Sequence, residues 1–309
     1  MDRIQPALKV NNLSKSYASV KAVDGISFEV KHGEIFGMLG PNGAGKTSTI
    51  RMILDIIKPD SGQIEVLGGS MSEDKKALIG YLPEERGLYE DMTLLDTLLF
   101  LGQLKGLSKN QALTRTEKYL RTVELWDVRE RKIEALSRGM TQKAQFVAAT
   151  LHEPELIIVD EPFSGLDPIN TQMIKSLLDQ MRERGSAIIM STHQMNRVEE
   201  MCSRIMLIDH GKQVLYGSVA DIRTQYAPHA IEVELEGELP DLTGLAKREQ
   251  INGAHRLLLK EGTNPEQLLR VLANSDKVQI RRFEELRASL EEIFVEVVGT
   301  EHYQQEQTA

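Results

Sequence analysis

The sequence contains a single cysteine, Cys202, among its 309 residues. One thiol excludes an internal disulfide and a zinc-binding cysteine cluster, and it is typical of a reducing cytosol. Long apolar runs are also absent, because none approaches the roughly 18 residues that a membrane-spanning helix requires. The first ten residues, MDRIQPALKV, lack the apolar core of a signal peptide. We therefore expect a chain that neither crosses a membrane nor is secreted by the usual route.

An excess of basic charge is missing as well. The chain has 46 acidic and 37 basic residues, which gives a net charge of -9. Proteins with broad nucleic-acid-binding surfaces usually have an excess of basic residues, so we expect no nucleic-acid partner. Any phosphate-binding site in this chain must therefore be local. With 41% hydrophobic residues, a chain of this length can form about two domains with real cores.

The first 220 or so residues alternate short apolar runs with helical patterns, which is typical of an α/β fold with a parallel sheet. We predict buried strands at 34–40, 155–162, 186–193 and 204–211. Residues 7–17 and 22–30 alternate apolar and polar side chains and predict antiparallel strands with one wet face. Residues 93–152 are helical almost throughout and predict a helical insertion.

From about residue 226 the pattern changes to a small α+β domain, 226–300. It predicts the order strand, strand, helix, strand, helix, at residues 230–240, 255–262, 264–275, 277–286 and 289–299. Asn264 before Pro265 is a good helix start. The tail, 301–309, is polar and is predicted to be disordered.

The segment GPNGAGKT, Gly40–Thr47, has the spacing of a phosphate-binding loop between a strand and a helix. Its glycines let backbone N–H groups turn toward an anion, and the helix adds the positive end of its dipole. Lys46 is expected to reach the β- and γ-phosphates of a nucleotide, and the Thr47 hydroxyl to bind Mg²⁺. The alternative is a glycine-rich turn that holds a lysine by chance. The predicted nucleotide-binding residues here are Gly40, Pro41, Asn42, Gly43, Ala44, Gly45, Lys46, Thr47 and Ser48.

Two carboxylates end the apolar strand LIIVDEP. Asp160 is placed to hold Mg²⁺, and Glu161 to orient or deprotonate an attacking water. Two acids at a strand end can also simply cap the next turn, but a phosphate loop upstream makes that interpretation weak. Kinases, GTPases and ATPases all remain open at this level.

Further motifs follow in a fixed order: LSRGM (136–140) with TQKAQ, then VDEP, SGLDP (164–168) and STH, which ends at His193. In order and spacing they resemble the ATP-binding-cassette (ABC) ATPases, over residues 7 to 220. The resemblance implies a phosphate-loop NTPase cassette at 1–225, with a mixed sheet core, an antiparallel β subdomain and a helical subdomain at about 93–152. A small-molecule kinase would leave the LSRGM motif unexplained.

The resemblance also implies roles for single residues. Tyr17 matches the aromatic residue that stacks on adenine, although a tyrosine at a strand end often only packs. Ser137 and Gly139 match the signature loop that binds the γ-phosphate held by a second copy of the domain. Asp167 matches the loop that connects the two sites, and His193 matches a switch histidine that contacts the γ-phosphate. A lone histidine is more often structural, but the place of His193 at the end of a core strand favours the switch role.

One phosphate loop and one signature in the chain imply a dimer, either a homodimer or a heterodimer with a related chain. The implied cofactors are ATP and Mg²⁺. ATP would join two domains, and hydrolysis would loosen them.

The sequence departs from the family pattern at three positions. Glu84 stands where glutamine is usual, and we expect it to contact Mg²⁺ and the attacking water. An ionised carboxylate can serve as an oxygen ligand but cannot donate a hydrogen bond. In the signature, Arg138 and Met140 replace glycine and glutamine. Arg138 either adds positive charge near the partner's phosphates or is a solvated surface arginine.

GYLPEERGLY, LSRGM and the C-terminal SLEEIFVEVVG together resemble the ATPase subunits of bacterial exporters of the sodium-extrusion and drug-resistance type. That branch implies a separate membrane permease and a place on the cytoplasmic face of the membrane. The rival is a cassette ATPase that acts on ribosomes or DNA. Such proteins usually carry two cassettes, long coiled coils or zinc modules, and this sequence has none of these.

Overall fold

The computed structural model describes residues 5–299, apart from 85–86, 228–229, 238, 252–253, 261, 276–277 and 287. The predicted disordered tail lies outside these residues. Two compact units divide at Val219, the first residue of helix α8 (Val219–Gln225), and the second unit comprises Ala220–Gly299. This division comes a few residues before the domain boundary expected from the sequence.

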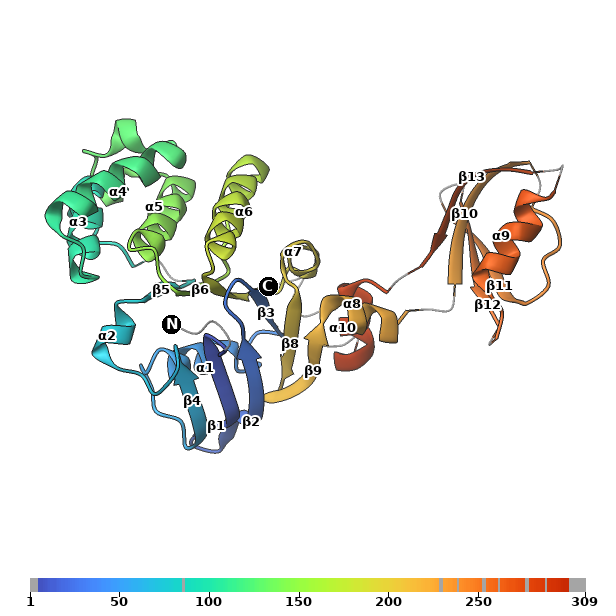
Figure 1. Ribbon diagram of the computed structural model, residues 1–309, viewed down its shortest axis with the longest axis horizontal. Helices are drawn as coiled ribbons and strands as arrows, with labels where there is room; N and C mark the ends of the chain where they lie inside the picture. Colours follow the sequence, from blue (N-terminus) through green and yellow to red (C-terminus); the bar gives the residue numbers. More distant parts are fainter. Residues whose placement is uncertain are drawn as a thin grey trace. The chain divides into compact units, whose positions relative to one another are not determined.

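The first unit is built on a six-stranded sheet in the order β5-β6-β7-β3-β8-β9 (Figure 1). Its strands are β5 (Ile79–Leu82), β6 (Leu156–Asp160), β7 (Ala187–Ser191), β3 (Ile35–Leu39), β8 (Arg204–Asp209) and β9 (Lys212–Ser218). All pairs are parallel except β8 with β9. Every residue of β3, β6 and β7 is buried, which explains their continuous apolar sequences.

The strand register brings the ends of three neighbouring strands to the same edge of the sheet. Ser191 of β7 pairs with Asp160 of β6 on one side and with Met38 of β3 on the other. The carboxyl ends of these three strands therefore reach the same edge of the sheet, where loops commonly bind ligands.

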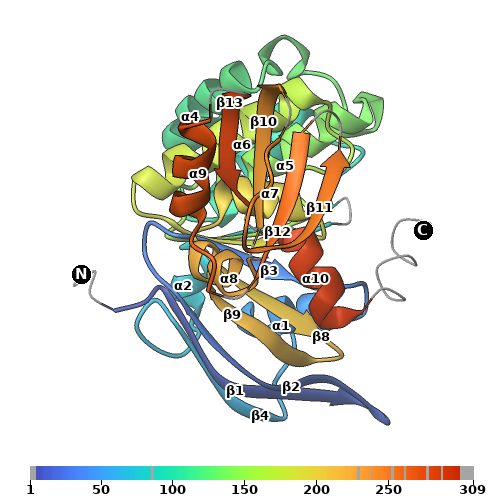
Figure 2. The ribbon, with the colours of Figure 1, turned by 90° about the vertical axis from the view of Figure 1, so that its right-hand side faces the viewer.

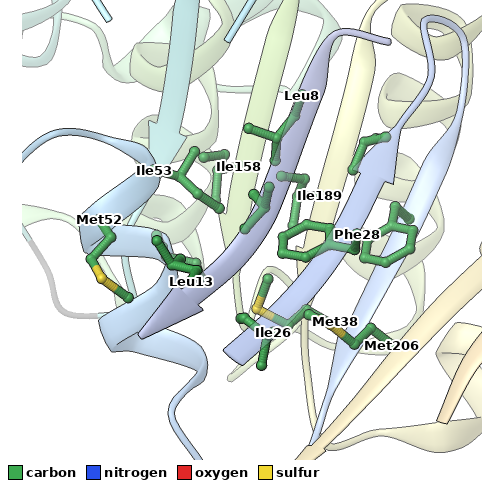
Figure 3. Packing of buried hydrophobic residues seen from close by; sticks show 14 of the residues in the cluster. Leu8, Leu13, Ile26, Phe28, Met38, Met52, Ile53, Ile158, Ile189 and Met206 are labelled. Carbon is green, nitrogen blue, oxygen red and sulfur yellow. The ribbon is translucent and has the colours of Figure 1, made fainter. Parts of the chain in front are cut away.

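A smaller antiparallel sheet, in the order β2-β1-β4, covers this core. It consists of β1 (Leu8–Tyr17), β2 (Val20–Val30) and β4 (Ser61–Val66). Leu8, Leu13 and Phe28 pack toward residues of the large sheet such as Ile158 and Ile189 (Figure 3). Helix α1 (Lys46–Ile53) joins the same cluster through its buried side chains. The helix that follows the phosphate loop is thus anchored in the core.

Helices gather on the other side of the large sheet (Figure 1). Thr93 caps the first long one, and a capping box formed by Ser108 and Gln111 opens the next. Besides α1, the helices described in this unit before α8 are α2 (Glu73–Lys76), α3 (Leu94–Leu104), α4 (Lys109–Thr122), α5 (Arg138–Thr150), α6 (Pro168–Glu183) and α7 (Met195–Met201), with short 3₁₀ turns at Trp126–Val128 and Ile133–Ala135. The predicted helical insertion is present as α3, α4 and α5.

The second unit contains a four-stranded antiparallel sheet in the order β11-β12-β10-β13, with α9 on one face (Figure 2). Its elements after α8 are β10 (Ala230–Gly237), β11 (Leu245–Ile251), β12 (Ala254–Leu259), α9 (Pro265–Ala273), β13 (Val278–Glu285) and α10 (Leu290–Val298). Strand β11 was not predicted from the sequence. Its sequence, LAKREQI, lacks apolar alternation, and the strand forms at the sheet edge by backbone pairing with β12. No helix among the described residues is long and apolar enough to cross a membrane.

Candidate functional site

The phosphate-binding loop connects β3 to α1 and depends on glycine at fixed positions. Gly40, Gly43 and Gly45 have φ angles of +148°, +78° and +112°. A Cβ atom on Gly40 would lie 2.1 Å from the Ile208 carbonyl oxygen, and one on Gly45 would lie 2.3 Å from that of Ala22. Both backbone conformation and space therefore require glycine. Gly45 offers no side-chain cap to α1, so the first N–H groups of this helix suit an anion.

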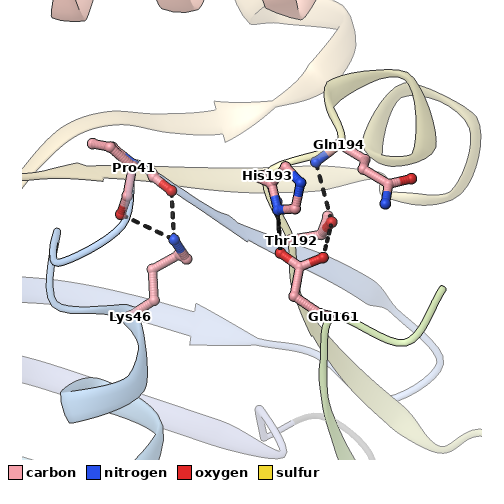
Figure 4. A network of polar contacts seen from close by, with 7 residues as sticks. Pro41, Lys46, Glu161, Thr192, His193 and Gln194 are labelled. Carbon is pink, nitrogen blue, oxygen red and sulfur yellow. Dashed lines mark hydrogen bonds and ion pairs between the residues drawn. The ribbon is translucent and has the colours of Figure 1, made fainter. Parts of the chain in front are cut away.

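Lys46 is the first residue of α1, and its side chain turns back over the loop (Figure 4). The ammonium donates to the carbonyl oxygens of Gly40 at 2.5 Å and Pro41 at 3.0 Å. These bonds hold the positive charge beside the loop. A phosphate placed in the loop would meet a cation that is already positioned.

A cavity of about 210 Å³ lies in front of the loop. Glu84 follows β5, Asp160 ends β6 and Glu161 follows it, and His193 follows β7. The lining residues are Ala22, Pro41, Asn42, Gly43, Ala44, Gly45, Lys46, Thr47, Ser48, Glu84, Asp160, Glu161 and His193. The structure therefore brings the predicted phosphate, metal and catalytic groups of one chain to one place.

Glu161 is held by three contacts with the residues that follow β7. Its side chain accepts hydrogen bonds from the Thr192 hydroxyl at 3.0 Å and from the His193 backbone N–H at 2.9 Å. The His193 Nδ1 atom lies 2.7 Å from the same carboxylate (Figure 4). Glu161 also has φ +49°, a left-handed conformation that is strained for a residue with a side chain. A carboxylate fixed in this way can act on a positioned water.

The sequence analysis did not assign Thr192. It stands between Ser191 and His193 in the STH motif, and its side chain is fully buried. A polar residue at the end of an apolar strand is the only signal that could have indicated it.

Asp160 is a buried acid beside other charges. Burial raises the pKa of Asp160, and the neighbouring carboxylates of Glu161 and Glu84 act in the same direction, while Lys46 opposes them. A divalent cation bound in the cavity would neutralise part of the negative charge of these carboxylates.

The donor set suits Mg²⁺. The Thr47 hydroxyl and the Asp160 and Glu84 carboxylates supply hard oxygen ligands in one cavity. Among the described residues, no three His, Cys, Asp or Glu side chains stand close enough to hold a metal ion on their own. Mg²⁺ in nucleotide sites is characteristically bound by one or two protein groups together with phosphates and water.

Five predicted site residues do not line this cavity: Gly40, Tyr17, Ser137, Gly139 and Asp167. Tyr17, at the end of β1, is 44% exposed, and its ring centroid lies 5.8 Å from the Lys15 ammonium. Ser137 caps α5, and its hydroxyl accepts from the Met140 N–H. Asp167 caps α6.

Gly139, in the first turn of α5, has open space around it, because an added Cβ would meet nothing within 4 Å. Ser137 and Asp167 are both exposed. These groups begin helices outside their own chain's nucleotide cavity.

A second cavity, about 400 Å³, forms a groove beside α3, α5 and the loop after β5. The residues that line it include Leu82, Pro83, Gly87, Leu88, Leu101, Leu104, Lys105, Gln145 and His152. Leu104 is 64% exposed there. The loop after β5 contributes Glu84 to the nucleotide cavity and its neighbour Pro83 to this groove, so the two cavities share a wall.

His152 in this groove predicts a pH dependence of stability. Burial, with help from Lys105, lowers the pKa of His152 to about 4, although its ring bonds the Ile79 carbonyl oxygen. The unfolded chain takes up the proton near pH 6.5, so stability is lost as pH falls from 6.5 toward 4, by up to roughly 3 kcal/mol. Urea unfolding across this range should show that loss for the wild type and a shallower one for His152→Gln. The exposed His210→Gln should behave like the wild type, and equal slopes in all three proteins would contradict the assignment.

Comparison with known proteins agrees with this geometry. The family described as "ABC transporter" matches residues 23–164, and "ATP-binding protein DrrA1-3-like, C-terminal domain" matches residues 217–298. The ABC transporter ATP-binding protein YhaQ of Bacillus subtilis is 36% identical over 94% of this chain and 98% of its own length. The chain belongs to the ABC transporter ATP-binding proteins.

Further relatives of this ABC protein agree. The linearmycin resistance ATP-binding protein LnrL of Bacillus subtilis is 40% identical over 70% of each chain. A solved ATP-binding subunit of an ABC transporter superposes with a TM-score of 0.68 and 32% identity, over 71% of this chain and 93% of that one. The cassette fold is thereby confirmed. ABC ATP-binding subunits bind ATP, hydrolyse it to drive transport, and work with a separate membrane permease.

Proposed function

We propose that this ABC protein is the ATPase subunit of an exporter and works as a homodimer that closes on Mg²⁺-ATP. The observation that carries the dimer is the separation of its predicted groups. The phosphate loop, Asp160 and Glu161 share one cavity, whereas Ser137 and Asp167 begin exposed helices outside it. A second chain could supply its own Ser137 and Asp167 to complete each site.

Within one site, the residues divide the work. The loop amides and Lys46 would bind the β- and γ-phosphates, while Thr47 and Asp160 would hold Mg²⁺, which shields the developing phosphate charge. Glu161, fixed by Thr192 and His193, would orient and deprotonate the attacking water. His193 would contact the γ-phosphate, and Tyr17 would stack on adenine from the edge of the antiparallel sheet.

The relatives support the proposed export direction, and the proposed place of the chain is on the cytoplasmic face of the membrane, beside its permease. LnrL is named for resistance to linearmycin, and the C-terminal domain matches a DrrA1-3-like family. We assign the same direction of transport here. The cargo would be chosen by the permease.

The groove fits the permease contact. It combines the exposed side chain of Leu104 with a wall that continues into the nucleotide cavity through Pro83 and Glu84. A permease segment seated there could move Glu84 relative to Mg²⁺ and water. This gives a direct path from the membrane partner to hydrolysis.

Affinity purification from gently solubilised membranes of the native cell tests the proposal. The tagged chain should bring down a stoichiometric protein with several membrane spans. Leu104→Asp should abolish that capture, whereas Ile56→Asp, at a side chain that is 61% exposed and does not line the groove, should not. Ribosomal or DNA-bound partners without a membrane protein would favour the non-transport alternative.

Glu84→Gln should change the ATPase rate by several-fold without abolishing it. Glutamine keeps an oxygen ligand and gains a hydrogen-bond donor, but it removes one negative charge from the group around Asp160. Steady-state phosphate release at saturating ATP and at varied Mg²⁺ checks this. Identical rates and Mg²⁺ dependence in both proteins would place Glu84 outside the working site.

A further inference from the structure

The first turn of α5 holds the loop that leaves Glu161. Arg138, the first residue of α5, lies against Gly165, which has φ +74°. A Cβ atom on Gly165 would lie only 2.8 Å from Nε and 3.2 Å from Cζ of Arg138. One turn later, Gln142 Nε2 donates to the Pro162 carbonyl oxygen at 3.4 Å. Residues four apart share one helix face, so Arg138 and Gln142 contact the same loop at two points; we call this pair the α5 clamp.

The position of Arg138 is not explained by the stability of the helix. A cation in the first turn opposes the helix dipole, which costs a few tenths of a kcal/mol or more. The guanidinium is exposed and forms no ion pair or hydrogen bond with the described residues. Its close neighbour in the structure is the Gly165 backbone. Glycine adopts this φ readily, and a side chain at position 165 would displace the Arg138 guanidinium.

The loop under the clamp joins groups that belong to two sites of the proposed dimer. It begins after Glu161, which acts in its own chain, and it ends at Asp167, which caps α6. Ser137 lies next to Arg138 and caps α5. The clamp therefore fixes the spacing between the two groups that one chain offers to its partner, Ser137 and Asp167.

We propose that Arg138, together with Gln142, is a positioning device that presents Ser137 and Asp167 to the partner's nucleotide as one unit. This inference rests on the proposed dimer. A glycine at position 138 could not make this contact, so Arg138→Gly removes the clamp contact of Arg138 with Gly165. Because misplacement by about 1 Å can cost 100-fold in rate, loss of the clamp should lower turnover in trans.

Mixed dimers test this directly. One tagged chain carries Glu161→Gln, so hydrolysis occurs only at the site of the intact chain, whose signature comes from the tagged one. In one mixed dimer, Arg138→Gly is placed on the tagged chain, whose signature completes the working site in trans. In the other, it is placed on the intact chain, whose signature faces the inactive site. Lys109→Gly is the matched control, since Lys109 is also an exposed first helical residue after a serine cap.

We expect Arg138→Gly in trans to lower the rate of a single round of ATP cleavage at the working site by about 10- to 100-fold, with ATP affinity and thermal unfolding close to those of the control. The same change on the intact chain should cost much less. Arg138→Lys should restore only part of the rate, because lysine lacks the planar group. Equal losses in both placements, or no loss beyond that of Lys109→Gly, would overturn the clamp while the dimer stands. If the Glu161→Gln chain fails to dimerise with ATP, the proposed function itself falls, and the clamp falls with it.

Discussion

Glu161→Gln is expected to stop ATP turnover and to trap two chains around bound ATP. The carboxylate is 7% exposed and held by three groups from Thr192 and His193. Removing a positioned general base costs typically 10²- to 10⁴-fold in rate. Nucleotide binding should survive, because the phosphate loop and Lys46 are untouched. ATP that binds without being cleaved would keep the dimer closed.

Phosphate release and light scattering with saturating ATP and Mg²⁺ measure the two effects. Glu155→Gln is the matched control, since Glu155 directly precedes the same strand at its opposite end. It should turn over ATP normally and show no lasting dimer. A monomeric Glu161→Gln protein at saturating nucleotide would disprove the two-chain site. Glutamine has one acceptor oxygen, whereas the two oxygens of the carboxylate accept from the Thr192 hydroxyl and the His193 N–H, so a small loss of thermal stability is also expected.

Lys46→Ala is expected to remove most of the nucleotide affinity. The ammonium is bound to the Gly40 and Pro41 carbonyl oxygens beside the loop, where it would meet the β- and γ-phosphates. A charge-assisted hydrogen bond contributes about 1.5 to 3 kcal/mol, and 1.4 kcal/mol is tenfold in affinity. Affinity for ATP should therefore fall at least about 10-fold and as much as 100-fold.

Equilibrium titration with a fluorescent ATP analogue in the presence of Mg²⁺ checks the expectation. Lys58→Ala serves as the control, because Lys58 is exposed beyond the other end of α1 and pairs with Asp55. It removes one positive charge from the same region without touching the loop. Normal affinity in Lys46→Ala would contradict the phosphate-loop assignment, whereas equal losses in both variants would point to net charge alone.

Local patterns in the sequence predicted most of the elements of the first unit. Runs such as ELIIVDEP and SAIIMSTH are apolar throughout because both faces of their strands are buried, and that burial is itself a property of parallel sheets. The edge strand β11 was not predicted, because its side chains show no such apolar run. It is held by backbone hydrogen bonds, which leave no mark on the side chains.

The candidate site was predictable where residues are neighbours in the sequence. The loop from Gly40 to Ser48 and the pair Asp160 and Glu161 follow from spacing alone. Thr192 was not identified, because only the folded chain shows that its hydroxyl points to Glu161. Likewise, the sequence left Arg138 open between a phosphate contact and a solvated surface, and the structure places it over Gly165.

The sequence by itself determined the phosphate loop, the acidic strand end and the family, because each depends on residue types at short, fixed separations. Only the tertiary structure decided which of these groups share a cavity. Strand β7 lies between β3 and β6 although it follows both in the chain, so sequence order does not give distance. The same fold leaves Ser137 and Asp167 outside the nucleotide cavity of their own chain. It also places the loop after β5 between the nucleotide cavity and the groove, so that this loop lines both. Which residues share a cavity depends on the packing of segments that are distant in the sequence, and local sequence patterns do not predict that packing.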